Sequence, residues 1–267
     1  MSRITQKGAT GALAFQAGTG FQTSTDANLT TLVGTRYDLS DGREVMLVSV
    51  GTAAIGTAGG LVQDAAIVSN HQNLTVGEYV AASANGNVPA SFNVTLGATK
   101  ADVNQYQGGF AVVNAGAGIG QTLRITKNAQ TAASGSCAIV LEDGANTALG
   151  VATKVCLIPP HGANVVINPT TPTGAPVGIT ISSLAAGIAA GATTGTPSFG
   201  FVTTKGLTSA FSDALVATVG QGISPSVTVT GATTVANGTA GVVVTTTIGY
   251  ANQTAVSGEA RSVFVNL

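Results

Sequence analysis

Charged residues are scarce in this chain. Only 8% of its 267 residues are Asp, Glu, Lys or Arg, and the formal net charge is −1. In an ordinary soluble domain about a quarter of the residues are charged. Disordered chains combine high net charge with low hydrophobicity, whereas 44% of these residues are hydrophobic. The composition therefore predicts a folded chain. Because no Lys/Arg run occurs, it lacks the basic footprint of a nucleic-acid partner.

Long apolar runs are also missing, although the mean hydropathy is +0.39. A transmembrane helix needs about 20 consecutive apolar residues, and Gly, Thr, Asn or Ser interrupts every run here. The first seven residues, MSRITQK, contain no continuous apolar stretch of the kind found in a signal peptide. We therefore expect cytoplasmic synthesis and no membrane partner.

Tryptophan is absent, aromatic residues make up 4% of the chain, and there are only two cysteines, Cys137 and Cys156. Two cysteines do not make the disulfide framework of a small secreted protein. A cross-strand disulfide between them is conceivable, but free thiols are favoured. The net charge is too small to keep copies of this chain apart by repulsion, so we expect other protein to cover much of its surface.

What the sequence does contain, from Arg36 onward, is short runs rich in Val, Ile, Thr and Leu between turn-forming residues. In one run Phe92, Val94 and Leu96 share a face, as in a strand with one buried side. The predicted fold class is all-β, with two antiparallel β lobes of sandwich or small barrel type and an extended N-terminal arm. The predicted strands are residues 44–50, 61–69, 78–82, 91–96, 110–114, 122–127, 137–142, 154–158, 164–167, 177–182, 199–204, 215–219, 226–230, 242–248 and 261–267.

Prolines suggest where the lobes divide. Five of the eight lie between Pro159 and Pro176, and proline cannot donate to a sheet ladder. We therefore predict an arm over residues 1–35, a first β lobe over 36–164 and a second over 165–267. The spacing of the strands does not decide between this division and one alternative. In that alternative the second lobe shares a sheet with residues 44–50, and residues 61–158 are an insertion.

The predicted arm is rich in Gly, Thr, Ser, Gln and Ala and shows no lasting periodicity. Its isolated apolar residues include Phe15, Phe21, Leu29 and Leu32. A solvated tail would not need such residues, so we predict that these four side chains are anchors that contact a partner.

The most conspicuous candidate for chemistry is a glycine-rich segment, residues 116–120 (GAGIG). A phosphate-binding loop of this kind opens a helix and carries a further glycine. Here Gln121 takes that position, and residues 121–126 alternate like a strand. A tight hairpin turn is therefore the favoured interpretation. No Gly-x-Ser-x-Gly nucleophile motif occurs either.

Metal-binding patterns are weak as well. His71 and His161 have no partner at ligand spacing, and we interpret both as structural or solvent-exposed. Residues 36–44 (RYDLSDGRE) hold three carboxylates that suit Ca²⁺, but two arginines are equally placed to pair with them. Asp41-Gly42 is a turn signal. We therefore expect no catalytic residue, no metal site and no cofactor, and the chain is predicted not to be an enzyme.

Four phrases carry a family resemblance: residues 36–44, 106–114 (YQGGFAVVN), 200–206 (GFVTTKG) and 219–226 (VGQGISPS). Together they resemble structural proteins of tailed bacteriophages, similar to capsid decoration or cement proteins, over residues 36–267. The resemblance implies an all-β virion protein, commonly a trimer, made in the host cytoplasm and placed on the outer capsid surface. It implies the major capsid protein as partner, with neighbouring capsid subunits clamped and the expanded head stabilised.

Two other functions stay open. One is a tail, neck or fibre-associated phage protein that binds a host glycan, which would need clustered aromatic residues and carboxylates. This chain has no Trp and only four Tyr. The other is a self-assembling surface-layer or adhesin-like protein, which the expected lack of a secretion signal disfavours.

Overall fold

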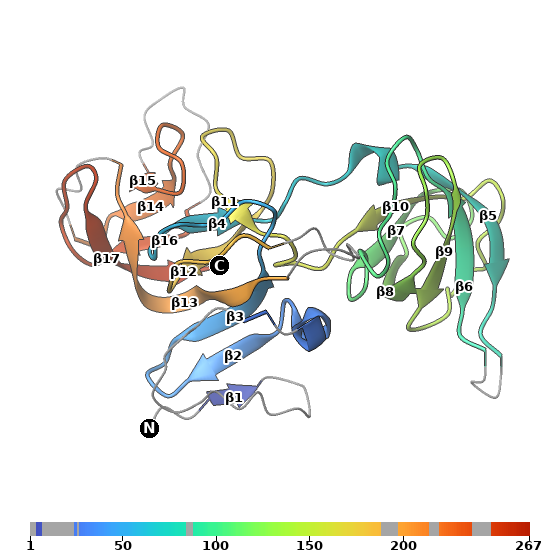
Figure 1. The fold of residues 1–267 in the computed structure, drawn as a ribbon, viewed down its shortest axis with the longest axis horizontal. Coiled ribbons are helices and arrows are strands. Elements are labelled where there is room, and N and C mark those ends of the chain that lie inside the picture. The colour runs from blue at the N-terminus through green and yellow to red at the C-terminus, as the bar shows by residue number, and fades with distance from the viewer. Residues whose placement is uncertain are drawn as a thin grey trace. The chain divides into compact units, whose positions relative to one another are not determined.

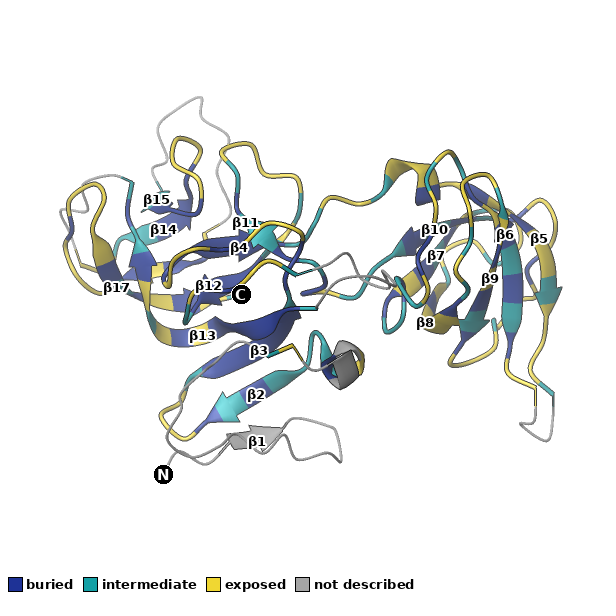
Figure 2. Cartoon of the chain, viewed as in Figure 1, coloured by how far each residue is buried: buried dark blue, intermediate teal, exposed yellow. Residues whose placement is uncertain are grey.

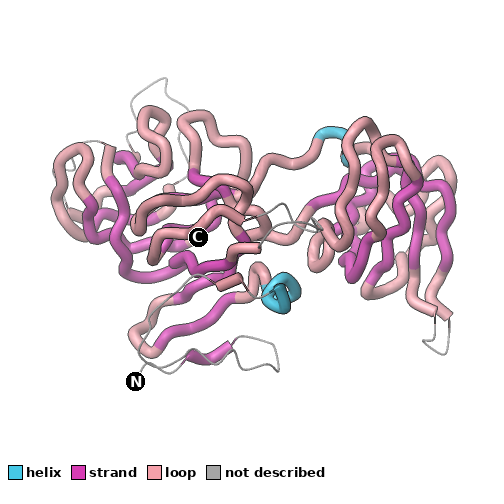
Figure 3. Tube along the Cα trace, in the orientation of Figure 1, coloured by secondary structure: helices cyan, strands magenta, loops and turns pink. Residues whose placement is uncertain are grey.

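The computed structural model describes residues 4–6, 24–25, 27–83, 88–187, 197–213, 219–236 and 247–267. The protein is nearly all β, with 45% strand and 3% helix, which confirms the predicted fold class. Figure 3 shows strands and connecting loops throughout, with two short 3₁₀ helices, η1 (Ala27–Leu32) and η2 (Ser69–His71). Among the described residues, no helix is long and apolar enough to cross a membrane.

The chain forms two compact units, which we describe separately. The sheet unit comprises Met1–Ala65, Gly162–Ile188 and Thr196–Leu267, and the barrel unit comprises Ala66–His161 and Ala189–Gly195. The strands before residue 65 therefore belong with those after residue 162. This differs from two consecutive lobes, 36–164 and 165–267, and has the form of the alternative with an insertion. The predicted boundary near residue 164 coincides with the second crossing.

The barrel unit is a closed, antiparallel six-stranded barrel with strand order β10-β5-β6-β9-β8-β7 (Figure 1). Alternate residues of its strands point inward, and Figure 2 shows this as alternating buried and exposed segments. Leu123 and Ile125, for example, are buried while Arg124 is exposed. Closure leaves no free strand edge. Its strands are β5 (Leu74–Val80), β6 (Ser91–Thr95), β7 (Phe110–Ala115), β8 (Thr122–Asn128), β9 (Ser136–Leu141) and β10 (Lys154–Ile158).

The sheet unit is an 11-stranded curled sheet whose main path runs β1-β2-β3-β13-β17-β16-β14-β15. Strands far apart in sequence pair here, and Figure 1 shows β3 beside β13. Its strands are β1 (Ile4–Gln6), β2 (Arg36–Leu39), β3 (Glu44–Ser49), β4 (Leu61–Gln63), β11 (Val166–Ile167), β12 (Pro176–Thr180), β13 (Phe199–Phe211), β14 (Gly222–Pro225), β15 (Thr233–Val235), β16 (Gly249–Ala251) and β17 (Ala260–Asn266).

One predicted strand is wrong. Residues 226–230 form a turn, and the strand ends before them at Pro225. The cause is local: the Ser226 hydroxyl accepts hydrogen bonds from the backbone N–H of Thr228 (3.0 Å) and of Val229 (2.9 Å). These side-chain bonds compete with a strand ladder. The predicted strands 215–219 and 242–248 lie largely outside the described residues.

The N-terminal region contributes to the sheet unit. β1 pairs antiparallel with β2, Ser24 forms a bridge with Phe199, and η1 precedes β2. Leu29 is buried in a core cluster with Tyr37 and Phe199, and Leu32 packs against that cluster. Residues 27–35 therefore form part of the folded sheet unit.

Candidate interaction site

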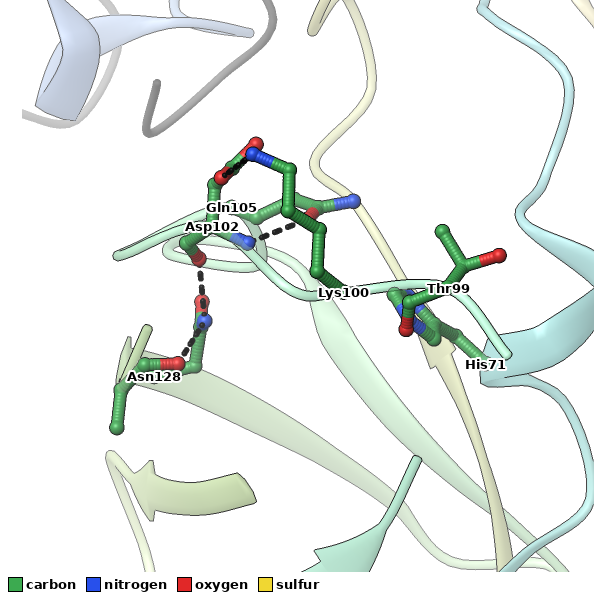
Figure 4. Close-up of polar contacts among 7 residues, drawn as sticks. His71, Thr99, Lys100, Asp102, Gln105 and Asn128 are labelled. Atoms are coloured by element: carbon green, nitrogen blue, oxygen red, sulfur yellow. Dashed lines mark hydrogen bonds and ion pairs between the residues drawn. The ribbon is translucent and has the colours of Figure 1, made fainter. Parts of the chain in front are cut away.

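A group of hydrogen-bonded polar side chains lies in the barrel unit, around the loop before β7 (Figure 4). His71 is completely buried there. Its Nε2 lies 2.9 Å from the carbonyl oxygen of Thr99. A carbonyl can only accept, so Nε2 carries the proton and donates it. With the ring proton on Nε2, Nδ1 accepts a hydrogen bond from the Tyr106 hydroxyl.

The same loop is tied to β8 by Asn128, which is fully buried. Its Nδ2 donates to the Asp102 carbonyl (2.8 Å), and its Oδ1 accepts from the Tyr106 N–H (2.8 Å). Lys100 Nζ lies 2.7 Å from Asp102 Oδ1, and Gln105 Oε1 accepts from the Asp102 N–H (Figure 4). Burial raises the pKa of Tyr106. These groups satisfy one another, so the arrangement holds the loop against the barrel.

The structure also shows where the other sequence candidates lie. His161 lies in an exposed turn. The 116–120 segment joins β7 and β8, which pair antiparallel, so it is the predicted hairpin turn. Cys137 and Cys156 are free thiols, as favoured. In the described parts of the chain, no group of three or more His, Cys, Asp or Glu side chains is placed to hold a metal ion.

Two of the three carboxylates of residues 36–44 pair with the arginines of the same segment. Arg36 Nη1 lies 2.8 Å from Glu44 Oε1, and Arg43 Nη2 lies 2.7 Å from Asp41 Oδ2. The hydrogen bond from Arg43 holds the pKa of Asp41 below its ordinary value. Gly42 has a φ of +83°, which a turn residue without a side chain adopts freely. The segment is therefore a turn with ion pairs.

Two of the four predicted anchors lie among the described residues. Leu29 is buried in the core of the sheet unit, and Leu32, which is half-buried, packs against that core, so both contact their own unit. The other two, Phe15 and Phe21, lie outside the described residues.

An apolar surface not predicted from the sequence crosses the sheet unit. Leu207 on β13 is directly opposite Phe264 on β17, and Phe264 is opposite Tyr250 on β16. All three side chains are exposed, Phe264 by 54%. We call these three residues the apolar row. The nearest same-face positions on β17, Ser262 and Asn266, are uncharged, and Lys205 on β13, opposite Asn266, brings one charge to this face.

The sheet unit also contains a pocket of about 160 Å³, which we call the Phe211 pocket. Its walls are fixed by backbone hydrogen bonds: Gly258 N–H donates to the Ser212 carbonyl (2.7 Å), and Gly231 N–H donates to the Asn168 carbonyl (2.8 Å). Val229 at this pocket is exposed. The lining residues are Thr57, Gly60, Ile167, Phe211, Ser212, Asp213, Val229, Thr230, Gly231, Ala232, Ser257 and Gly258.

Asp213 is the one charged residue that lines the Phe211 pocket. Its Oδ2 accepts hydrogen bonds from the hydroxyls of Ser226 and Thr228, the latter at 2.8 Å. Arg261 is 1% exposed and its Nη2 donates to Thr233 Oγ1. Burial lowers the pKa of Arg261, and the negative charge of Asp213 counteracts that shift. Asp213 Oδ1 is buried without a hydrogen-bond partner, so the pocket wall carries one carboxylate, with the buried Arg261 close enough to feel its charge.

Comparison of this chain with models of known protein families, with curated proteins and with solved structures found no match. The assignment to a bacteriophage structural family therefore stays a prediction from the sequence phrases.

Two features of the site were missed from the sequence. The apolar row had a weak signal, because Phe264 interrupts the polar face of an otherwise alternating strand, Ser262-Val263-Phe264-Val265-Asn266. The Phe211 pocket had none, because its walls come from five separate stretches of the chain.

Proposed function

We propose that this protein is a virion structural protein that decorates and stabilises the outer surface of a phage capsid by clamping major-capsid subunits. Its role is structural rather than catalytic, and it acts as a homo-oligomer, a trimer in the family that the sequence resembles. The observation that carries the proposal is the apolar row on the sheet unit.

The apolar row supports a contact with protein for a physical reason. Exposed apolar side chains that are adjacent on one face are typical of interaction sites, whereas scattered ones are not. Leu207, Phe264 and Tyr250 lie on three consecutive strands, so register holds them side by side. Aromatic side chains bury roughly 150–250 Å² each. Covering the row therefore removes roughly 300 Å² of apolar surface from water. An area of this size can form the centre of a standard interface, which buries about 800 Å² per partner.

Low charge supports the same proposal at the level of the surface. With 8% charged residues and a net charge of −1, the chain presents few ions that would need to be desolvated on binding. A shell of repeated subunits multiplies modest contacts, so no single interface needs high affinity.

Electron microscopy of the native particle tests the proposal. Hundreds of copies on the icosahedral head support it. A dozen or fewer copies at the tail would instead indicate the tail, neck or fibre-associated alternative, and the proposal would be abandoned.

Binding of purified protein to heads that lack it tests the apolar row. Phe264→Ser is expected to reduce occupancy about tenfold or more, because one large apolar contact is lost. Phe110→Ser makes the same chemical change at an exposed position on the barrel unit and serves as the matched control. Equal occupancy for wild type and Phe264→Ser would contradict a contact through the row.

The N-terminal region is tested by removal of residues 1–23. This truncation keeps Leu29, Leu32 and the Ser24–Phe199 bridge, which the sheet unit needs. The truncation also removes the edge strand β1, which pairs with β2. If the arm contacts the capsid, occupancy falls while both units still unfold cooperatively. Wild-type occupancy would remove the arm from the proposed mechanism.

A further inference from the structure

The most exposed large apolar side chains in the described parts of the chain, Ile119 (67%) and Val151 (74%), lie in neighbouring loops of the barrel unit. Ile119 is in the 116–120 turn. The 147–153 loop packs against that turn, because Thr153 Oγ1 donates to the Ala117 carbonyl (3.1 Å) and Gln121 Nε2 donates to the Thr147 carbonyl (3.2 Å). Two apolar side chains therefore project from one hydrogen-bonded pair of loops.

The turn presents Ile119 in a fixed position. Gly118 and Gly120 on either side have φ values of +79° and +87°. The Gly120 N–H donates to the Val113 carbonyl (2.9 Å), and the Gln121 N–H and side chain both donate to the Gly118 carbonyl. Because the backbone of the turn is pre-organised, only the rotamer of Ile119 remains to be ordered when a partner buries the side chain. We call the exposed Ile119 side chain on this turn the knob.

The Phe211 pocket fits such a knob in size. A cavity of about 150 Å³ lined by apolar side chains accommodates a benzene-sized group, and the Phe211 pocket has about 160 Å³. Pockets for cofactors and drug-sized ligands are larger, about 300–1,000 Å³. The volume suits one large side chain. Phe211, Ile167, Val229 and Ala232 supply apolar contacts for it.

Charge also matches between the two surfaces. Residues 116–121 (GAGIGQ) contain no ionisable side chain. The single carboxylate of the pocket, Asp213, is held by two hydroxyls and lies in the field of Arg261. The neutral Ile119 side chain therefore places no second charge opposite Asp213, and the apolar residues of the pocket wall are left to contact it.

We propose that Ile119 of one copy inserts into the Phe211 pocket of a second copy. Knob and pocket are different surfaces, so the contact is heterologous: it closes into a ring where the rotation between copies permits, and otherwise it extends as a filament. A closed ring is the form in which a decorating oligomer saturates every knob and pocket. This inference rests on the proposed function, because the second copy of the chain is taken to be the partner within the decorating oligomer.

Light scattering of the full-length protein over a concentration series tests the contact. Wild type is expected to associate. Ile119→Ser removes the knob, and Ser257→Leu fills the mouth of the pocket from an exposed position. Each is expected to weaken association about tenfold or more. Val80→Ser, an exposed apolar position on β5, is the matched control and leaves association unchanged.

Cysteine pairing distinguishes this contact from other modes of assembly. In a Cys156→Ser background, one chain carries Ile119→Cys and another carries Ser257→Cys. Under mild oxidation, a disulfide-linked dimer is expected in the mixture and in neither chain alone. A dimer in the Ile119→Cys sample alone would indicate a symmetric contact between two knobs and overturn the proposal.

The two proposals fail in different ways. A monomer at every concentration, or association that Phe264→Ser abolishes and Ile119→Ser does not, overturns the knob-and-pocket contact. Head occupancy is measured on the same variants. Intact association together with no binding to heads overturns the proposed function while leaving the contact between copies in place.

Discussion

At the scale of single residues, the clearest dependence is that of His71 on Tyr106. The imidazole donates from Nε2 to the Thr99 carbonyl, so its Nδ1 depends on the Tyr106 hydroxyl for a donor. Tyr106→Phe removes that donor and leaves a buried acceptor unsatisfied. We expect a loss of about 1–3 kcal/mol in the stability of the barrel unit. Hydrogen exchange of peptides from β5–β10, read by mass spectrometry, measures it without interference from the sheet unit.

Tyr250→Phe is the matched control for this substitution. The Tyr250 side chain is exposed, and surface changes alter stability by less than about 0.5 kcal/mol. Equal protection in the Tyr106→Phe variant and in wild type would contradict the tautomer assigned to His71.

Two buried acids predict how the barrel unit responds to alkali. Burial raises the pKa of Tyr106 above its ordinary 10.0 and the pKa of Cys137 above its ordinary 9.0. The unfolded chain therefore releases these protons at lower pH than the folded one does. Stability is fully present below pH 9.0 and falls as pH rises through 9.0 and then 10.0. Unfolding is measured between about pH 8 and about pH 11.

The variants Cys137→Ala and Tyr106→Phe separate the two contributions. Each is expected to flatten the fall in stability over the range in which its own group titrates, whatever its effect at neutral pH. An unchanged pH dependence in both would show that other groups cause the alkaline loss.

At the scale of elements, regular alternation made the barrel strands predictable. In residues 91–96 and 122–126, every second residue is apolar, and these runs became β6 and β8. Residues 199–204 of β13 were predicted although all of them are buried. The continuation of β13 to Phe211 was missed because its sequence, KGLTSAF, shows no apolar alternation. The Ser226 turn was mistaken for a strand because its valines alternate, although side-chain hydrogen bonds decide its shape.

Close approach of β16 to β17 depends on a glycine. A Cβ at Gly249 would lie 2.1 Å from the carbonyl oxygen of Phe264, a backbone atom that cannot rotate away. Gly249→Ala therefore forces the two strands apart, and we expect the sheet unit to lose about 3 kcal/mol. Gly56→Ala, where a Cβ meets nothing within 4 Å, is the control. Thermal unfolding of both variants measures the difference, and equal melting temperatures would show that the ladder accommodates a methyl group.

At the scale of the whole molecule, the sequence left open whether the barrel is an insertion. The proline-rich stretch marks one crossing, but the pairing of residues 44–49 with 199–205 spans about 150 residues of chain, and no local pattern encodes it. The candidate site has the same limitation. The Phe211 pocket combines β13 and β11 with loops near residues 57, 230 and 257, which only the folded sheet brings together.

The insertion predicts that each unit folds without the other. The two crossings lie close together in the sheet unit, since the Gly162 N–H donates to Asp64 Oδ1 (2.8 Å). Replacing residues 66–161 with a Gly-Ser linker of about four residues, a length common for loops in compact domains, should keep that junction closed. We expect the shortened chain to unfold cooperatively, and residues 66–161 alone to form the barrel with its own core. Circular dichroism and amide exchange measure both. Collapse of the shortened chain, with the isolated barrel still folded, would mean that the sheet unit depends on the barrel.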